Sequence, residues 1–320
     1  MVTQNAFSSF SRPGEYLPGF CVLLLALFVL VSTAGCSVRK FTANRFANVL
    51  AQSNPVYASD NDPDLVGEAL PFGLKTMESL LIETPKHRGL LVATASGFTQ
   101  YAYAYVDLRA FEIEDTERQR ARELRQRAKR LYLRGRDYAL RALEVKEPGL
   151  DEKLRQDPEG ALAAMTAHDV APLYWATAAW SAAIAADRQD MRMVADLNLI
   201  GQMINRCLEL DEQFHQGAIH QFMIEFEGTR SPAQGGSVER ARRHFARAME
   251  LAHGQQVSPL VAFAETVSVR LQNRQQFEQL LQEALAFDVD TAPEQRLGNL
   301  IAQRRAQVLM SRIDDYFIGD

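Results

Sequence analysis

Along this chain the apolar residues recur mostly at spacings of three and four, which is the period of an amphipathic helix. One stretch is ambiguous, because Tyr101, Tyr103 and Tyr105 alternate with alanines as they would in a strand. The proline-free segment 87–112 is much longer than an ordinary strand of roughly 4–8 residues, so a helix is favoured. In a helix Tyr103 points away from the face that carries its two neighbours. That face forms a stripe of Leu91, Thr94, Phe98, Tyr101, Tyr105 and Leu108.

Helix-start signals occur throughout the chain. Three dipeptides place a capping side chain before a proline at the first helical position: Asp62-Pro63, Asp157-Pro158 and Ser258-Pro259. Thr291 with Glu294 matches a capping box, and Pro71 predicts a kink. The expected helices cover residues 40–54, 63–84, 88–112, 116–146, 158–166, 170–187, 190–211, 214–228, 238–253, 259–273, 275–287 and 293–317.

Five of these helices end in similar sequences, which resemble the ALELDP end of a tetratricopeptide (TPR) repeat. They are SLLIETP from Ser79, ALEVKEP from Ala142, CLELDE from Cys207, AMELAHG from Ala248 and ALAFDVD from Ala284. Ala241 and Phe245 match the A-x₃-F signature, and Trp175 lies near the usual tryptophan position. Because such repeats bury their faces only against neighbours, we predict one continuous domain over residues 62–320. Its fold class is all-α, a TPR-like helical-repeat array with long, divergent helical hairpins.

The N-terminus predicts a lipoprotein signal peptide over residues 1–35. The apolar run FCVLLLALFVLV begins at Phe20 and is too short for a membrane span, which needs about 20 residues. Ala34 and Gly35 before Cys36 resemble a bacterial lipobox, so we expect lipid attachment at Cys36. The alternative is an ordinary cleaved signal or a short anchor. If Cys36 is lipidated, residues 36–61 form a lipid-anchored N-terminal segment. Ser37 slightly favours the outer membrane.

Composition and motifs argue against several functional classes. The net charge of −5 disfavours non-specific nucleic-acid binding. His215 and His220 are five residues apart, which does not place them on one helical face as metal ligands. Cys207, after loss of the signal and acylation of Cys36, has no intrachain partner and is expected to be a buried thiol. No nucleophile elbow, phosphate loop or dinucleotide fingerprint is present, so we expect neither catalysis nor a cofactor.

Two features could contact a ligand or a partner. Residues 114–136 have an excess of positive charge, which is typical of a solvated helix face and could alternatively dock an acidic partner. Aromatic residues at helical spacing usually form core, yet tyrosine also suits a partly wet cavity. The candidates for a ligand-channel wall are Phe98, Tyr101, Tyr105, Trp175 and Trp180.

Several long stretches, in one order along nearly the whole mature chain, resemble the TatT component of TRAP (tripartite ATP-independent periplasmic) transporters, a family of TPR-containing periplasmic lipoproteins. They include residues 60–106, "RAKRLYLRGRDYALRALE" at 127–144, "DVAPLYW" at 169–175, residues 207–227, "SPLVAFAETVSV" at 258–269 and residues 299–317.

The resemblance implies an all-helical lipoprotein on the periplasmic side of the bacterial cell envelope. It implies a homo-oligomer, expected as a trimer, that binds the periplasmic solute-binding protein of a TRAP transporter. It also implies an internal channel or cavity, apolar in character, that holds or passes the solute. The resemblance does not fix the solute, for which our hypothesis is a small organic, apolar acid. The alternative function is a TPR adaptor lipoprotein in outer-membrane or cell-wall assembly.

Overall fold

The computed structural model describes residues 45, 47–48 and 54–318, and in this part of the chain every regular element is a helix. The all-α prediction is therefore confirmed. Inter-residue contacts divide the chain into the units Met1–Phe46 and Ala47–Asp320, and the second unit is the subject below. Cys36, the signal segment and most of the helix expected at 40–54 lie outside the described residues.

The first helices begin as their capping residues predict. After α2 (Asn54–Ala58), α3 (Pro63–Glu83) starts where the Leu65 backbone N–H donates to Asp62 Oδ1 at 3.0 Å. Helix α3 continues through Pro71 without a break.

The ambiguous tyrosine stretch is helical, with a local change of winding. It forms α4 (Arg88–Tyr101), the π-helix η1 (Ala102–Asp107) and α5 (Leu108–Glu112). A second π-helix, η5 (Ala264–Ser268), follows α14 (Ser258–Phe263). Single π-helical turns inside α-helices are rare and are frequent at functional sites, so both segments draw attention.

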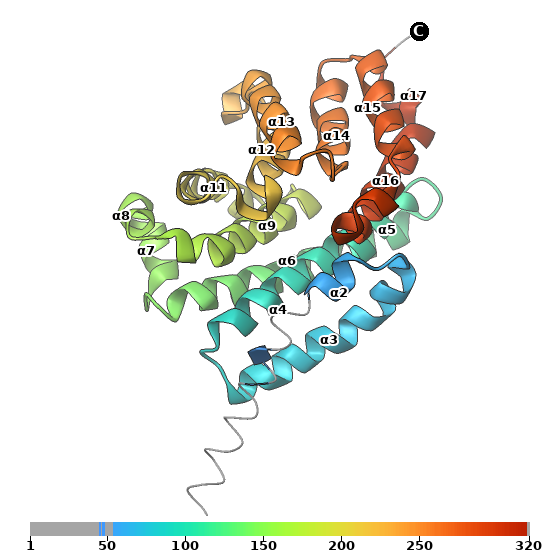
Figure 1. The fold of residues 1–320 in the computed structure, drawn as a ribbon. Coiled ribbons are helices and arrows are strands. Elements are labelled where there is room, and N and C mark those ends of the chain that lie inside the picture. Colours follow the sequence, from blue (N-terminus) through green and yellow to red (C-terminus); the bar gives the residue numbers. More distant parts are fainter. Residues whose placement is uncertain (1–44, 46, 49–53, 319–320) are drawn as a thin grey trace, which may run out of the picture. The chain divides into compact units, whose positions relative to one another are not determined.

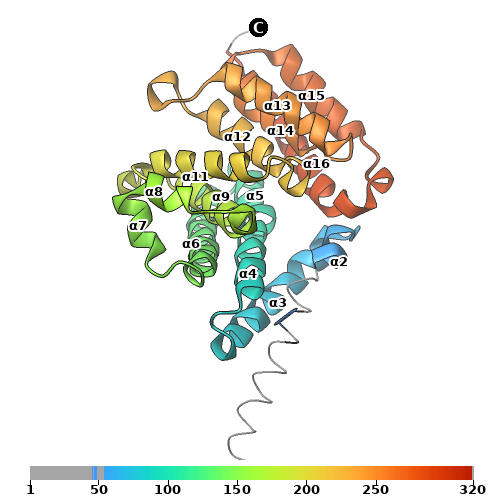
Figure 2. The ribbon, with the colours of Figure 1, turned by 60° about the vertical axis from the view of Figure 1, so that its left-hand side comes forward.

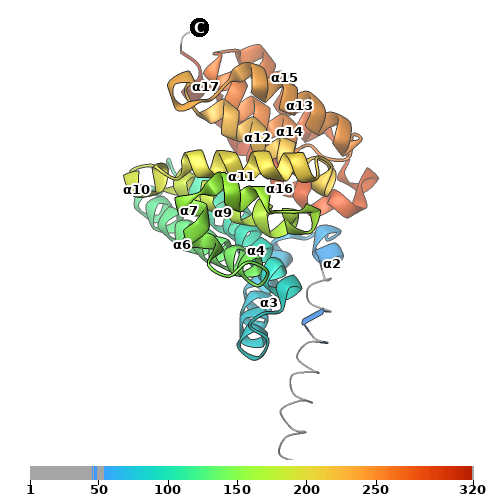
Figure 3. The same ribbon diagram turned by 90° about the vertical axis from the view of Figure 1, so that its left-hand side faces the viewer.

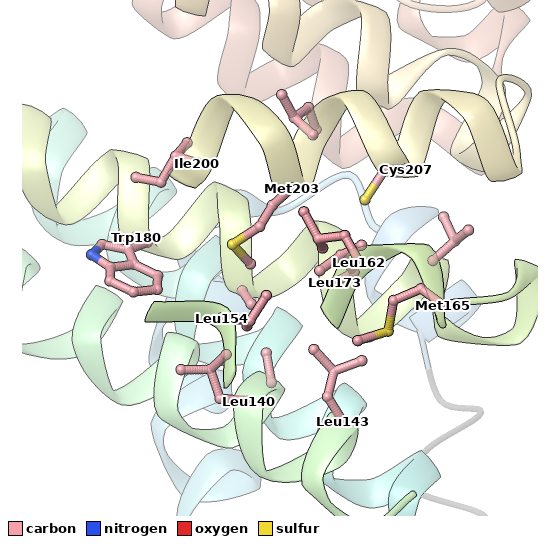
Figure 4. Packing of buried hydrophobic residues seen from close by; sticks show 14 of the residues in the cluster. Leu140, Leu143, Leu154, Leu162, Met165, Leu173, Trp180, Ile200, Met203 and Cys207 are labelled. Carbon is pink, nitrogen blue, oxygen red and sulfur yellow. The ribbon is translucent and has the colours of Figure 1, made fainter. Parts of the chain in front are cut away.

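The long helix α6 (Arg118–Glu144) packs against α4 and α9 (Val170–Ala186), and α9 packs against α11 (Leu197–Leu210). Figure 3 shows α11, α9 and α6 stacked in succession. The largest hydrophobic cluster fills the space between these helices, with Trp180 and Met203 fully buried (Figure 4). Cys207 is a buried free thiol in this cluster, as predicted.

One helix in this region was not predicted. Residues 150–156 were expected to be loop, but they form α7 (Leu150–Gln156), because Gly149 adopts a left-handed φ of 77° and Leu150 and Leu154 are buried. The short helices α8 (Pro158–Ala163) and α10 (Met191–Val194) flank α9. The short 3₁₀ segments are η2 (Ala167–Asp169), η3 (Phe214–Gln216), η4 (Pro232–Gln234), η6 (Val289–Thr291) and η7 (Pro293–Gln295).

The second half continues as consecutive packed helices. They are α12 (Ala218–Thr229), α13 (Val238–Ala252), α14, α15 (Arg274–Ala286), α16 (Arg296–Ser311) and α17 (Ile313–Tyr316). Within the all-α class, the TPR-like character of this arrangement stays a prediction.

Two of the expected caps are wrong. Ser258 is already inside α14 and donates its hydroxyl to Gln221 Oε1 at 2.9 Å. Thr291 donates to the Asp288 carbonyl at 2.6 Å in a 3₁₀ turn, and α16 starts only at Arg296. In both cases the hydroxyl donates to another oxygen and does not cap the start of the helix.

The described chain closes on itself. α16 contacts α2, α3 and α5, which lie some two hundred residues earlier, and all three views place it beside α2 (Figures 1, 2 and 3). Arg304 forms an ion pair with Glu112, and Arg312 Nε lies 2.6 Å from Asp115 Oδ2. The first and last described helices of this unit are therefore in contact, and we call this arrangement a closed array.

Candidate functional site

A group of polar side chains from four elements interacts electrostatically around Arg305. We call it the interior cluster, and it consists of Tyr103 and Asp107 of η1, Glu225 of α12, Glu265 of η5 and Arg305 of α16. Both π-helices contribute to it. The widened turns of η1 and η5 thus carry polar residues at the same place.

The Glu265–Arg305 pair is the fixed part of the interior cluster. Arg305 Nε donates to Glu265 Oε2 at 2.6 Å, and Nη2 donates to Oε1 at 2.5 Å. The guanidinium carbon lies 4.8 Å from the Phe111 ring centroid and 5.8 Å from that of Tyr103. Burial alone would lower the pKa of Arg305, but the Glu265 carboxylate raises it well above its usual value. Arg305 therefore stays charged and held in position.

Glu225 is the variable part of the interior cluster. Its carboxyl makes no hydrogen bond or ion pair with any residue that the structure describes, and its side chain is exposed. Burial by surrounding protein, reinforced by the Glu265 charge and opposed by Arg305, raises the pKa of Glu225 to about 7.

Tyr103 and Asp107 complete the cluster from η1. Tyr103 keeps 39% of its surface accessible, yet burial raises its pKa to about 12. Tyr132 donates its hydroxyl to Asp107 Oδ2 at 3.2 Å, and burial raises the pKa of Asp107.

The five aromatic residues that the sequence singles out do not form one wall. Phe98 and Tyr101 are buried in one hydrophobic cluster and Trp180 in another, where they pack as core residues. Tyr105 and Trp175 are half-buried. The hydroxyl of Tyr105 and Nε1 of Trp180 are buried and have no hydrogen-bond partner among the described residues. A channel role for these residues stays a prediction.

Four of the five interior-cluster residues were not predicted from the sequence. The fifth, Tyr103, was noted only because it points away from the aromatic stripe. Glu225, Glu265 and Arg305 lie 40 residues apart in the chain, and each looks like an ordinary surface charge on an amphipathic helix. The packing of α12, η5 and α16 in the second half of the chain brings them together.

The basic run of α6 is partly neutralised by acidic neighbours. Arg125 forms two hydrogen bonds with Glu114, at 2.6 and 2.5 Å. Lys129 Nζ donates to Asp187 at 2.8 Å and to Asp190 at 2.9 Å. The two interpretations of the run, as a solvated helix face or as a docking surface, stay predictions.

Two further searches of the described residues found no candidates. No group of three or more histidine, cysteine or acidic side chains is placed to hold a metal ion in that part of the chain. None of the helices described in residues 45–318 combines the length and the apolar character of a membrane span.

Comparison with known proteins gives two findings. The model of the TRAP transporter T-component family matches residues 59–317. The chain is also 27% identical to an uncharacterized protein of Treponema pallidum (strain Nichols) over 319 residues, which cover 94% of this chain and 99% of the relative. The family match includes every element of the interior cluster. The chain therefore belongs to the TRAP transporter T-component family, which implies an accessory role in a TRAP transport system of the cell envelope.

Proposed function

We propose that this protein is a lipid-anchored periplasmic accessory protein that binds the solute-binding protein of its TRAP system. The observation that carries the proposal is the family match over residues 59–317, which covers nearly all of the described chain. The lipobox-like sequence ending at Cys36 supports attachment to a membrane on its periplasmic side, with the outer membrane favoured by Ser37. The working assembly is a homo-oligomer, a trimer.

The second part of the proposal is that the closed array holds or passes a small organic acid. The interior cluster supports it, because polar groups that converge among aromatic rings are typical of small-molecule sites. Of the five aromatic residues predicted from the sequence, Tyr105 and Trp175 are the better candidates for contact with a solute, since both are only half-buried.

Co-purification tests the partner directly. The C-terminally tagged, full-length protein is crosslinked mildly in its native membranes and purified, and the co-purifying proteins are identified by mass spectrometry. Enrichment of a TRAP solute-binding protein over a tag-only control is the expected result. If proteins of β-barrel assembly or peptidoglycan synthesis dominate and no solute-binding protein is enriched, the adaptor function replaces this proposal.

A further inference from the structure

Helix α3 carries large apolar side chains on the face that it does not bury. It packs chiefly against α4, with a smaller contact to α16. On its outer face Leu65 is 56% exposed, Phe72 80% and Ile82 78%. Of the nine large apolar side chains that are exposed in the described residues, four lie on α2 and α3. A single exposed apolar residue is ordinary, whereas several on one helix mark an interaction surface.

The spacing of these side chains suits a fluid surface better than a rigid one. Leu65 and Phe72 are two helical turns apart on one line, and Ile82 follows nearly three turns later, about a quarter-turn from that line. The exposed residues Ala69 and Ser79 between them are short, so the three apolar side chains project separately. A folded partner would need a matching pocket for each, whereas lipid closes around each side chain by itself.

The start of the described chain limits where a membrane can lie relative to α3. Ala47 is fully buried in a hydrophobic cluster with Met77 and Leu81 of α3. Cys36 precedes Ala47 by 11 positions in the sequence, and a chain of that length spans at most about 40 Å. Helix α3 has 21 residues and is therefore about 32 Å long. A lipid on Cys36 thus brings the membrane surface within reach of the whole outer face of α3.

We propose that α3 lies along the surface of the membrane that holds the lipid of Cys36, with Leu65, Phe72 and Ile82 inserted among the lipids. The inference rests on the proposed lipid anchor and adds the protein surface that faces the bilayer. Three side chains alone would hold the protein on a membrane only weakly. The anchor makes their insertion an intramolecular step, so that a high local concentration compensates for the weak affinity.

The contact is apolar rather than electrostatic, and it orients the molecule. The charged residues Glu68 and Lys75 are also exposed on this face, and their opposite signs give it no excess of positive charge to attract anionic lipids. Insertion is therefore expected to be insensitive to salt. All three views place α3 and α15 at opposite ends of the array, so α15 would point away from the membrane (Figures 1, 2 and 3).

Spin-label accessibility in vesicles tests this inference. Phe72→Cys and the matched control Glu283→Cys, at an exposed site on α15, are made in the full-length lipidated protein, labelled with a nitroxide and reconstituted into phosphatidylcholine vesicles. Cys207 is buried, and protein without an added cysteine serves as the labelling blank. We expect collisions with a water-soluble nickel chelate to be severalfold rarer at position 72 than at position 283, and collisions with oxygen to be more frequent. Salt at about 1 M should leave this difference unchanged.

Two results would overturn the inference while leaving the anchor in place. One is protein that floats with the vesicles but whose label at position 72 meets the chelate as often as the label at position 283. The other is spin–spin broadening between labels at position 72, which would show that a second copy of the chain covers this face. If Phe72→Cys does not fold, Ile82→Cys serves instead, with the same expectation. Protein that does not float with the vesicles would contradict the proposed lipid anchor, and the inference would fall with it.

Discussion

His220 and His244 join α12 to α13 through their ring nitrogens, with Nδ1 of each 2.8 Å from Nδ1 of the other. One nitrogen must donate and the other must accept, so both rings cannot be protonated. His220 Nε2 also lies 3.2 Å from Glu212 Oε1. Burial, together with the neighbouring His220, lowers the pKa of His244 to about 4.

This pair predicts a loss of stability in mild acid. Unfolded histidine has a pKa of about 6.5, so between pH 6.5 and 4 the unfolded chain binds more protons than the folded one. The stabilisation from neutral His244 is complete above pH 6.5 and is lost as the pH falls towards 4. The free energy of unfolding in urea should drop over this range by ~1–3 kcal/mol more in the wild type than in His244→Gln. An exposed-site control, His168→Gln, should behave like the wild type, and a drop of equal size in His244→Gln would contradict the account.

Single residues differ in how far the sequence predicts their surroundings. The burial of Cys207 followed from its position on a helix face. The unpartnered carboxyl of Glu225 did not, because its neighbours Glu265 and Arg305 reach it only through the packing of three separate helices. Local periodicity carries no information about such contacts.

At the scale of elements, helix starts are predictable where the cap has no competing partner. Asp62 and Asp157 each accept a backbone N–H at 3.0 Å, as expected. Ser258 and Thr291 fail as caps because another oxygen accepts their hydroxyl hydrogens. The π-helices had no local signal, since an extra residue in a helical turn is accommodated by the packing around it.

The contact between α4 and α6 depends on Gly135. A Cβ at this position would lie 2.6 Å from Thr99 Oγ1 and 3.0 Å from the Ala95 carbonyl oxygen, which are atoms of the facing helix. Gly135→Ala should therefore push the two helices apart and cost about 1–3 kcal/mol of unfolding free energy, measured in urea.

Gly298 provides the matched control. It is exposed on α16, and a Cβ there would meet nothing within 4 Å. Gly298→Ala should raise the unfolding free energy by up to about 1 kcal/mol, because alanine favours the helix. Equal effects of the two substitutions would show that α4 and α6 do not approach as closely as described.

At the scale of the whole molecule, the ends of the described chain are held together by charge. Arg304 Nη2 donates to Glu112 Oε2 at 3.1 Å across 192 residues of sequence, and Arg296 Nη1 donates to the Ser59 carbonyl at 2.9 Å. The sequence predicted a helical array but not its closure, because closure depends on the summed curvature of all the helices. Closure brings Tyr103 of η1 next to Arg305 of α16, whereas Glu265 and Arg305 meet within the second half.

The N-terminal segment makes its own prediction about where the whole protein resides. If Cys36 is the acylated residue, Cys36→Ser should abolish incorporation of radiolabelled palmitate and move the protein out of the membrane fraction. Cys21 lies in the apolar run that precedes Cys36, and Cys21→Ser should leave the labelling unchanged. Continued labelling of Cys36→Ser would show that another residue carries the anchor.

The central claim is that this protein acts in TRAP-dependent uptake, and uptake itself tests it most directly. The radiolabelled solute of the co-purified solute-binding protein is supplied to cells that lack the protein and to cells in which it is restored. We predict that uptake falls severalfold without the protein, recovers with the wild-type chain and stays low with Cys36→Ser. Unchanged uptake in cells that lack this protein, when removal of the solute-binding protein abolishes it, would contradict the account.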